Sequence, residues 1–246
     1  MRIWDLNPGY LNRGSLLGEH RELHGILNII ILGKKGYSRH PETLRWKGHL
    51  EALKARHELL VSEMHLRGYQ HHSPVTIEGP PAWPVAYIDP PGEQFEILAC
   101  KYTDKEPGRV PLPRNVQELW AQHKYSVMAR DPQRYRQIGR SLVGSDDRSS
   151  MADLAAELVH TLRRQPPAGR LTNALQHLWG YVSHYEEAEP GPSTDPAVLM
   201  AAVRELTIRH SVTYLLHSTA LSDLDAWIAM PEPTAQRDGD HEGGTR

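Results

Sequence analysis

Residues 43–67 have the sequence TLRWKGHLEALKARHELLVSEMHLR, and their periodicity is the clearest sign of the fold class. Apolar side chains recur there at helical spacing and, with one histidine, form a single stripe that contains Trp46, Leu50, Leu53, His57, Leu60 and Met64. Pro41 suits the first turn of a helix, and Gly68 suits its C-terminal cap. We therefore predict one amphipathic helix here, with His57 as a histidine of the core.

Helical patterns continue on both sides of this segment. Upstream, the apolar residues with helical spacing are Leu16, Leu23, Leu27 and Ile30. Ser15 is the candidate N-cap of that helix, and Gly33 is its predicted stop. Downstream, the patterns predict helices at about 114–129, 132–142, 150–164, 170–185 and 195–218.

Nine prolines between Pro74 and Pro113 exclude a long helix from that stretch. Its one regular candidate is a small β-hairpin, made of residues 84–88 and 94–102 around Asp-Pro-Pro-Gly. We predict an all-α protein whose parts are a helical domain at 1–75, a Pro-rich linker with this hairpin at 76–112, a second helical domain at 113–229 and a disordered polar tail at 230–246.

The composition narrows the functional classes. The chain has 246 residues with 28 Lys and Arg, 30 Asp and Glu, and a mean hydropathy of −0.55. A single cysteine excludes an internal disulfide and a cysteine zinc ribbon. The chain lacks a long apolar run and the apolar core of a signal peptide, so we expect a soluble cytoplasmic protein. Residues 1–75 and 111–185 are each net basic, which makes nucleic acid a candidate partner.

Nucleotide-binding and nucleophile-elbow motifs are absent from the sequence. The nearest metal-like string runs from His20 to His24, and its two histidines share a helix face as a zinc site requires. Arg21 stands where the zincin pattern needs Glu, so we favour a solvated or DNA-facing surface and predict no metal and no organic cofactor. The other histidines that could complete a metal site lack a diagnostic spacing, and they are His40, His49, His57, His65, His71 and His72.

Glu22 shares one face of its helix with Gly18 and Gly25. Glycines around a carboxylate leave room for a ligand or a backbone to approach closely. The alternative is that this face packs against another helix and leaves Glu22 at the rim. The spacing alone does not separate these two interpretations.

Five short strings agree in order and spacing with one known family, and they are Met1–Trp4, Glu19–Leu23, Gly48-His49, Leu50–Arg56 and Leu66–Tyr69. Through them residues 1–69 resemble the pyrimidine-dimer DNA glycosylase/AP-lyase family, endonuclease V of phage type. The chain departs from that family at Gly25, where the family has an arginine, and at His24, where it has a proline. The aromatic C-terminal segment of the family has no match.

The resemblance implies a nucleophile at the α-amino group of Met1, which would form a Schiff base with the sugar of a damaged nucleotide. An α-amino group suits this task because its ordinary pKa is about 7.7–8.0, far below that of a lysine side chain. Because the side chain of Arg2 is too large for methionine aminopeptidase, Met1 is expected to remain at the N-terminus. Glu22 matches the catalytic carboxylate, and Arg21 matches an arginine that grips phosphates. The expected nucleic-acid contacts of this segment are Arg2, His20, His24, His49, Lys54 and Arg56.

A second resemblance lies at about 111–220, where residues 119–125, 135–140 and 172–181 are similar to the DUF1722 domain. That domain also occurs fused to a desulfidase domain that acts on thiolated uracil in tRNA, which implies nucleic acid, RNA included, as a partner. The candidate contacts are His123, Lys124, Arg136, Arg140, Asn173, His177 and Tyr181. In the alternative interpretation, Asn173 and His177 hydrogen-bond inside a helical bundle.

Together these features predict a DNA-repair glycosylase/AP lyase that acts on pyrimidine-dimer or abasic sites in double-stranded DNA. Two alternatives stay open. One is a non-catalytic nucleic-acid-binding or accessory protein of DNA repair or of modified tRNA. The other is a His-rich, metal-dependent hydrolase.

Overall fold

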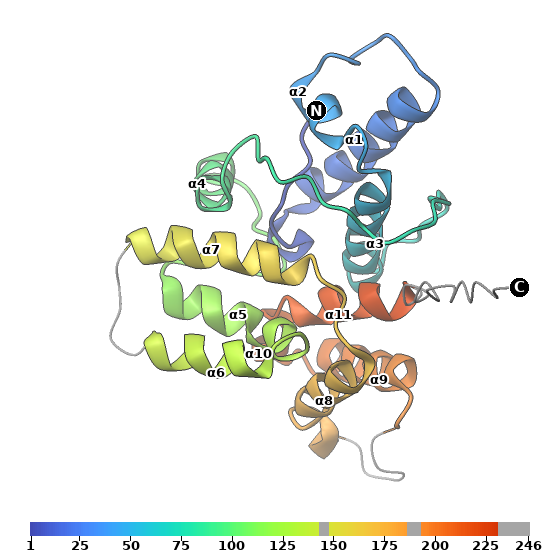
Figure 1. Ribbon diagram of the computed structural model, residues 1–246. Coiled ribbons are helices and arrows are strands. Elements are labelled where there is room, and N and C mark those ends of the chain that lie inside the picture. The colour runs from blue at the N-terminus through green and yellow to red at the C-terminus, as the bar shows by residue number, and fades with distance from the viewer. Residues whose placement is uncertain (143–147, 186–192, 231–246) are drawn as a thin grey trace, which may run out of the picture.

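Helices are the only regular structure among the described residues, 1–142, 148–185 and 193–230, of the computed structural model (Figure 1). The all-α prediction is therefore confirmed. The α-helices are α1 (Arg13–Ile31), α2 (Pro41–Trp46), α3 (Leu50–Leu66), α4 (Pro91–Lys101), α5 (Val116–Met128), α6 (Pro132–Ser141), α7 (Arg148–Leu162), α8 (Ala168–Trp179), α9 (Pro196–Arg209), α10 (Thr213–Leu216) and α11 (Ala220–Ala229). No described helix has both the length and the apolar character needed to cross a membrane. The predicted disordered tail lies, apart from Met230, outside the described residues.

Local backbone chemistry moves several predicted helix ends. Asn12 caps α1 instead of Ser15, because its Oδ1 accepts the backbone N–H of Ser15 at 2.9 Å. The single helix predicted over 43–67 is two helices, since Gly48 adopts a φ of +86° between α2 and α3. Gly33 and Gly68 also have positive φ and follow the ends of α1 and α3 as predicted. The predicted helix at 195–218 is likewise divided into α9 and α10, and α11 follows it.

The predicted β-hairpin is wrong, because its second strand is the helix α4. Pro91 occupies the first turn of α4, where a missing N–H leaves no hydrogen bond unmade. Phe95 and Leu98 are buried on one face of this helix. Gln94 fixes it to the N-terminal segment, since its Oε1 accepts the Asp5 N–H at 2.9 Å and its Nε2 donates to Asp5 Oδ2 at 2.9 Å. Burial at a helical period therefore outweighed the strand-like alternation.

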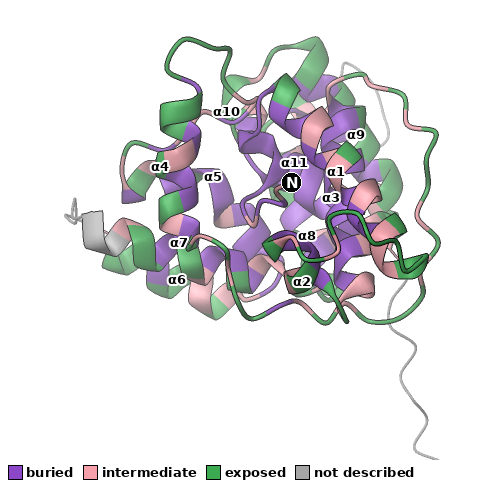
Figure 2. Ribbon diagram, turned by 90° about the horizontal axis from the view of Figure 1, so that it is seen from above, coloured by how far each residue is buried: buried purple, intermediate pink, exposed green. Residues whose placement is uncertain are grey.

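Two hydrophobic cores hold the helices together. The first combines the N-terminal segment, α1 and α3 with α4, α5 and α7, and the second combines α5, α8, α9 and α11. α3 packs along α11, and buried residues gather on α3, α5 and α11 at the centre of the molecule (Figures 1 and 2). The packing therefore crosses the predicted division between residues 1–75 and 113–229.

Buried ion pairs reinforce this contact, and we call them the α3–α11 junction: Glu63, Arg67, Arg109, Arg130 and Asp223. Glu63 of α3 accepts from Arg67 and from Arg109, each at 2.7 Å. Burial alone would raise the pKa of Glu63, but the two guanidinium groups lower it to about 2. Arg130 of the α5–α6 connection pairs with Asp223 of α11 at 2.9 Å. Each of these charges therefore has a partner.

Candidate active site

The N-terminal segment is fixed by side chains that accept its backbone N–H groups. Four successive N–H groups, from Arg2 to Asp5, donate in order to Glu22, Glu42, Glu19 and Gln94. The Ile3 and Trp4 donors lie 3.2 Å from their carboxylate oxygens. Burial is the main cause that raises the pKa of Glu19 and of Glu42, each of which also faces an arginine. Side chains of α1, α2 and α4 thus fix the position of the N-terminal segment in the fold.

This arrangement gathers three functional groups, which we call the amine site: the Met1 amine, Glu22 and His40. The Glu22 carboxylate of α1 accepts the N–H of Arg2, the residue next to the amine. The Met1 nitrogen lies 3.5 Å from Nε2 of His40, the N-cap of α2. Figure 1 shows the N-terminus beside α2 and close to α1. A primary amine, a carboxylate and an imidazole therefore meet at one half-buried place.

His40 is a site residue that sequence reasoning did not single out for this role. Its Nδ1 accepts the backbone N–H of Glu42 at 3.2 Å, so the neutral ring carries its proton on Nε2. That N–H faces the Met1 nitrogen. The signal available in the sequence was the string His40-Pro41-Glu42, which marks a helix N-terminus but not its approach to Met1.

The face of α1 that carries Glu22 is open at both of its glycines. A Cβ added at Gly18 or Gly25 would meet no atom within 4 Å. The alternative in which this face packs tightly on another helix is therefore wrong at these two positions. Arg21 is exposed next to Glu22 and makes no ion pair among the described residues. Arg2 pairs with Asp89 at 2.7 Å and lies 4.0 Å from the ring centre of Trp4.

Two of the predicted nucleic-acid contacts are wrong because the side chains are buried. Arg56 is 2% exposed and is bidentate to Glu19 at 2.7 and 2.9 Å. His123 is 4% exposed, and its Nδ1 donates to the Leu119 carbonyl at 2.9 Å. Burial lowers the pKa of His123 to about 4, so the ring is neutral near pH 7. Both side chains stabilise the interior of the protein, and nothing in the neighbouring sequence indicated that they are buried.

The remaining predicted contacts are spread over α3, α6 and α8. His49 contacts the Ala82 carbonyl through Nδ1 at 2.7 Å, and Lys54 is half-buried on α3. Exposed side chains on α6 and α8 are Arg136, Arg140, Asn173 and His177. These two helices lie at the end of the molecule opposite the N-terminus (Figure 1). Since Asn173 and His177 are exposed, the interpretation in which they bond inside a bundle is wrong.

Lys124 and Tyr181 belong to an aromatic group instead. The Tyr125 hydroxyl donates to the Tyr181 hydroxyl at 2.9 Å, and the Lys124 ammonium lies 5.2 Å from the ring centre of Tyr214. The hydrogen bond from Tyr125, the largest cause, and the nearby Lys124 charge lower the pKa of Tyr181. Tyr125 is buried, whereas Tyr181 and Tyr214 are exposed, and their contacts join α5 to the C-terminal helices.

Four histidines converge on the inner side of α1: His20, His24, His57 and His71. Burial, followed by the neighbouring imidazoles, lowers the pKa of His20 to about 4 and also lowers the pKa of His24 and His71. The spacing of His20 and His24 was visible in the sequence. The approach of His57 from α3 and of His71 from beyond α3 depends on tertiary packing and was not predicted.

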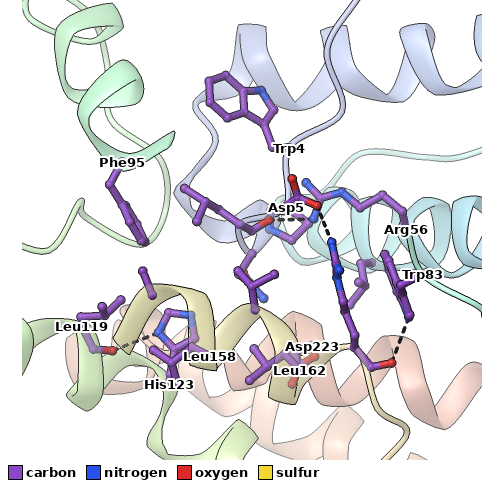
Figure 3. Close-up of a pocket in the computed structure, with 17 residues that line it drawn as sticks. Trp4, Asp5, Arg56, Trp83, Phe95, Leu119, His123, Leu158, Leu162 and Asp223 are labelled. Carbon is purple, nitrogen blue, oxygen red and sulfur yellow. Dashed lines mark hydrogen bonds and ion pairs between the residues drawn. The ribbon is translucent and has the colours of Figure 1, made fainter. Parts of the chain in front are cut away.

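A pocket lies where the N-terminal segment meets α5 and α7 (Figure 3). Its charged lining residues are paired: Asp5 with Arg163 at 2.6 Å, Arg56 with Glu19, and Asp223 with Arg130. The rest of the lining is mostly apolar and includes Phe95, Leu119 and Leu158. We regard this pocket as a packing gap between the two halves of the chain.

Two segments of the chain match known protein families. Residues 1–77 match the family described as pyrimidine dimer DNA glycosylase, and this match supports DNA as the partner. Residues 124–190 match a family described as a protein of unknown function, DUF1722. Searches of curated proteins and of solved structures found no match. The two matched segments, 1–77 and 124–190, are therefore similar to two different families.

Proposed function

We propose that this protein is a DNA glycosylase and AP lyase whose nucleophile is the α-amino group of Met1. One observation carries the proposal: the Glu22 carboxylate binds the N–H next to that amine, while His40 lies 3.5 Å from the amine nitrogen. A nucleophile, a proton-handling carboxylate and a second polar group are the parts that Schiff-base chemistry at a sugar needs.

The amine would attack C1′ of the damaged nucleotide, displace the base and form an iminium ion with the opened sugar. Glu22 would take up and return protons at the sugar and stabilise the positive iminium. The lyase step would then break the bond to the 3′ phosphate by β-elimination. The reacting groups in this scheme are the Met1 amine, the Glu22 carboxylate and the sugar of the damaged nucleotide.

His40 supports the first step by its tautomer. Its Nε2–H is directed at the Met1 nitrogen, and only a neutral amine has a lone pair to accept that hydrogen. The contact would hold the Met1 nitrogen in position for attack. The four backbone N–H contacts of residues 2–5 hold the N-terminal segment in one position before DNA binds. The amine is therefore preorganised, and no further ordering of the chain is required on binding.

The exposed Arg21 is the proposed phosphate contact beside the lesion. Arg136 and Arg140 on α6, and the exposed polar residues of α8, are proposed to contact the DNA backbone farther from the lesion. Because α6 and α8 lie at the opposite end of the molecule, those contacts would add affinity and not chemistry (Figure 1).

The test compares Glu22→Gln with Glu96→Gln, an exposed glutamate of α4 that serves as the matched control. The Glu22 variant should cleave a duplex with a single abasic site about 10²–10⁴-fold more slowly, because the proton acceptor is lost. Its affinity for the duplex should be unchanged or slightly tighter, and the control should cleave at the wild-type rate. Circular dichroism verifies that both variants fold. A folded Glu22→Gln that cleaves at the wild-type rate would favour the non-catalytic accessory protein.

A further inference from the structure

The four converging histidines have the composition and spacing of a metal site. His20 and His24 lie one turn apart on α1, His57 comes from α3, and His71 comes from the segment after α3. Each offers one ligand nitrogen, and the four nitrogens lie within 4.8 Å of one another. The cluster uses none of the groups of the amine site.

The distances suit a tetrahedral centre. Nε2 of His20 and Nε2 of His24 lie 3.3 Å apart. Zinc–nitrogen bonds are about 2.0–2.1 Å long, so two nitrogens of a tetrahedral zinc site are separated by roughly 3.4 Å. The His57 ring centre lies 5.2 Å from that of His20, 5.1 Å from that of His24 and 4.9 Å from that of His71. Small side-chain rotations would bring all four nitrogens to bonding distance.

Unpaired buried nitrogens point to a missing ligand. Nε2 of His57 and Nε2 of His71 are buried and have no hydrogen-bond partner. Buried polar atoms without a partner are uncommon, because burial removes the hydrogen bonds they would make with water. The Nδ1 atom of His57 contacts Glu58 Oε1 at 3.1 Å, which is the usual arrangement of a carboxylate behind a metal-binding histidine. That contact places the proton on Nδ1 and leaves Nε2 with a free lone pair.

We propose that His20, His24, His57 and His71 bind one zinc ion in a closed structural site. Four neutral imidazoles form a donor set that suits a borderline divalent ion, and zinc accepts four such ligands in a tetrahedron. Four protein ligands leave no open position for a substrate, so this site does not support the metal-dependent hydrolase alternative. The site also replaces our expectation from the sequence that the chain binds no metal.

The position of the ion explains what it would do. Glu22 is two residues from His20 and two from His24, which places it about 200° around the helix, on the opposite face of α1. Zinc would join α1 to α3 and to the segment after α3 from behind the helix that carries Glu22. It would therefore stabilise the support of the amine site without contacting DNA.

The experiment uses the full chain, stripped of metal with a chelator, dialysed and titrated with Zn²⁺ at pH 7.5. Wild-type protein should retain one zinc per chain by elemental analysis, and its melting temperature should rise by several degrees. His24→Gln should lose most of the bound zinc and the thermal shift. His65→Gln, an exposed histidine of α3, is the matched control and should keep both.

His71→Gln lies outside the helices and repeats the test if His24→Gln does not fold. Co²⁺ bound to wild-type protein should give the visible absorption of a tetrahedral nitrogen site, and this absorption should be lost in the same variant. The proposal is overturned if wild-type protein binds no zinc after titration. It is also overturned if the His65 control loses as much zinc as the ligand variants.

Discussion

The amine site and the α3–α11 junction are built from the same kinds of side chain but use them differently. At the junction, Glu63 and Asp223 are buried and each is paired with arginine. At the amine site, Glu22 is half-buried and binds only a backbone N–H, and the neighbouring Arg21 is exposed without an ion pair among the described residues. In this protein the paired charges of the junction hold helices together, whereas Glu22 and Arg21, which lack an ion-pair partner in the described part of the chain, are available for chemistry and binding.

The largest effect expected at the junction comes from Glu63→Gln. This change leaves Arg67 and Arg109 without a carboxylate in a buried place, so we expect a loss of about 3–5 kcal/mol in the free energy of unfolding. Glu205→Gln is the matched control, because Glu205 forms an exposed pair with Arg209 at the same i,i+4 spacing, and it should lose less than about 1 kcal/mol. Urea unfolding measures both.

The pKa of Glu63 gives this prediction a pH dependence. The folded-state pKa of about 2 lies below the ordinary value of 4.5, so the unfolded chain binds the proton first as the pH falls. The stability contributed by Glu63 is therefore complete above about pH 4.5 and is lost towards pH 2. If the difference between wild type and Glu63→Gln is the same at pH 3 as at pH 6, the pairing at the junction is wrongly assigned.

An intermediate effect is expected for His123, which is buried beside the junction. Its pKa of about 4 lies below the ordinary value of 6.5, so protons bind the unfolded chain first and destabilise the fold as the pH falls from 6.5 to 4. In His123→Leu this loss should be smaller by about 1–3 kcal/mol over that range. His160→Leu, at an exposed position of α7, should keep the wild-type slope. Equal slopes in wild type and His123→Leu would contradict the assignment.

The smallest effect concerns DNA affinity. Arg21→Ala should weaken binding to a duplex with an abasic site by about 5–10-fold and reduce the salt slope by about 1, because one phosphate contact is lost. Its stability should stay within about 0.5 kcal/mol of wild type. Arg136→Ala on the distant α6 should change affinity less. A larger loss for Arg136→Ala would place the principal DNA contact on the C-terminal helices.

The fold class and most helices could be predicted because their signals are local. Asp131 and Asp195 cap α6 and α9, which begin at Pro132 and Pro196, at or next to the predicted starts of these helices. The break at Gly48 could not be predicted, since the apolar stripe continues from Trp46 to Leu50 across it. The helix α4 was mistaken for a strand because its burial depends on Gln94 and Asp5, which are 89 residues apart.

The candidate site was predictable only in part. Glu22 and Arg21 follow from the resemblance over residues 1–69, and the structure adds the position of Glu22 beside the first N–H groups. His40 lies 39 residues from Met1, and no spacing rule connects them. Two of the four clustered histidines could be predicted to lie together, because His20 and His24 have the i, i+4 spacing of one helix face. His57 and His71 approach them only when α3 packs on α1.

Borohydride trapping on a duplex with an abasic site tests the central claim most directly, because borohydride fixes a Schiff base as a covalent protein–DNA adduct. The chain with a free Met1 and the same chain with its N-terminus blocked by a short tag should be compared before and after the tag is cleaved back to Met1. We predict an adduct with the free chain, none with the blocked chain and recovery after cleavage. Equal trapping by the blocked chain would contradict the account and move the nucleophile to a lysine, with Lys34, Lys35 and Lys54 as the candidates.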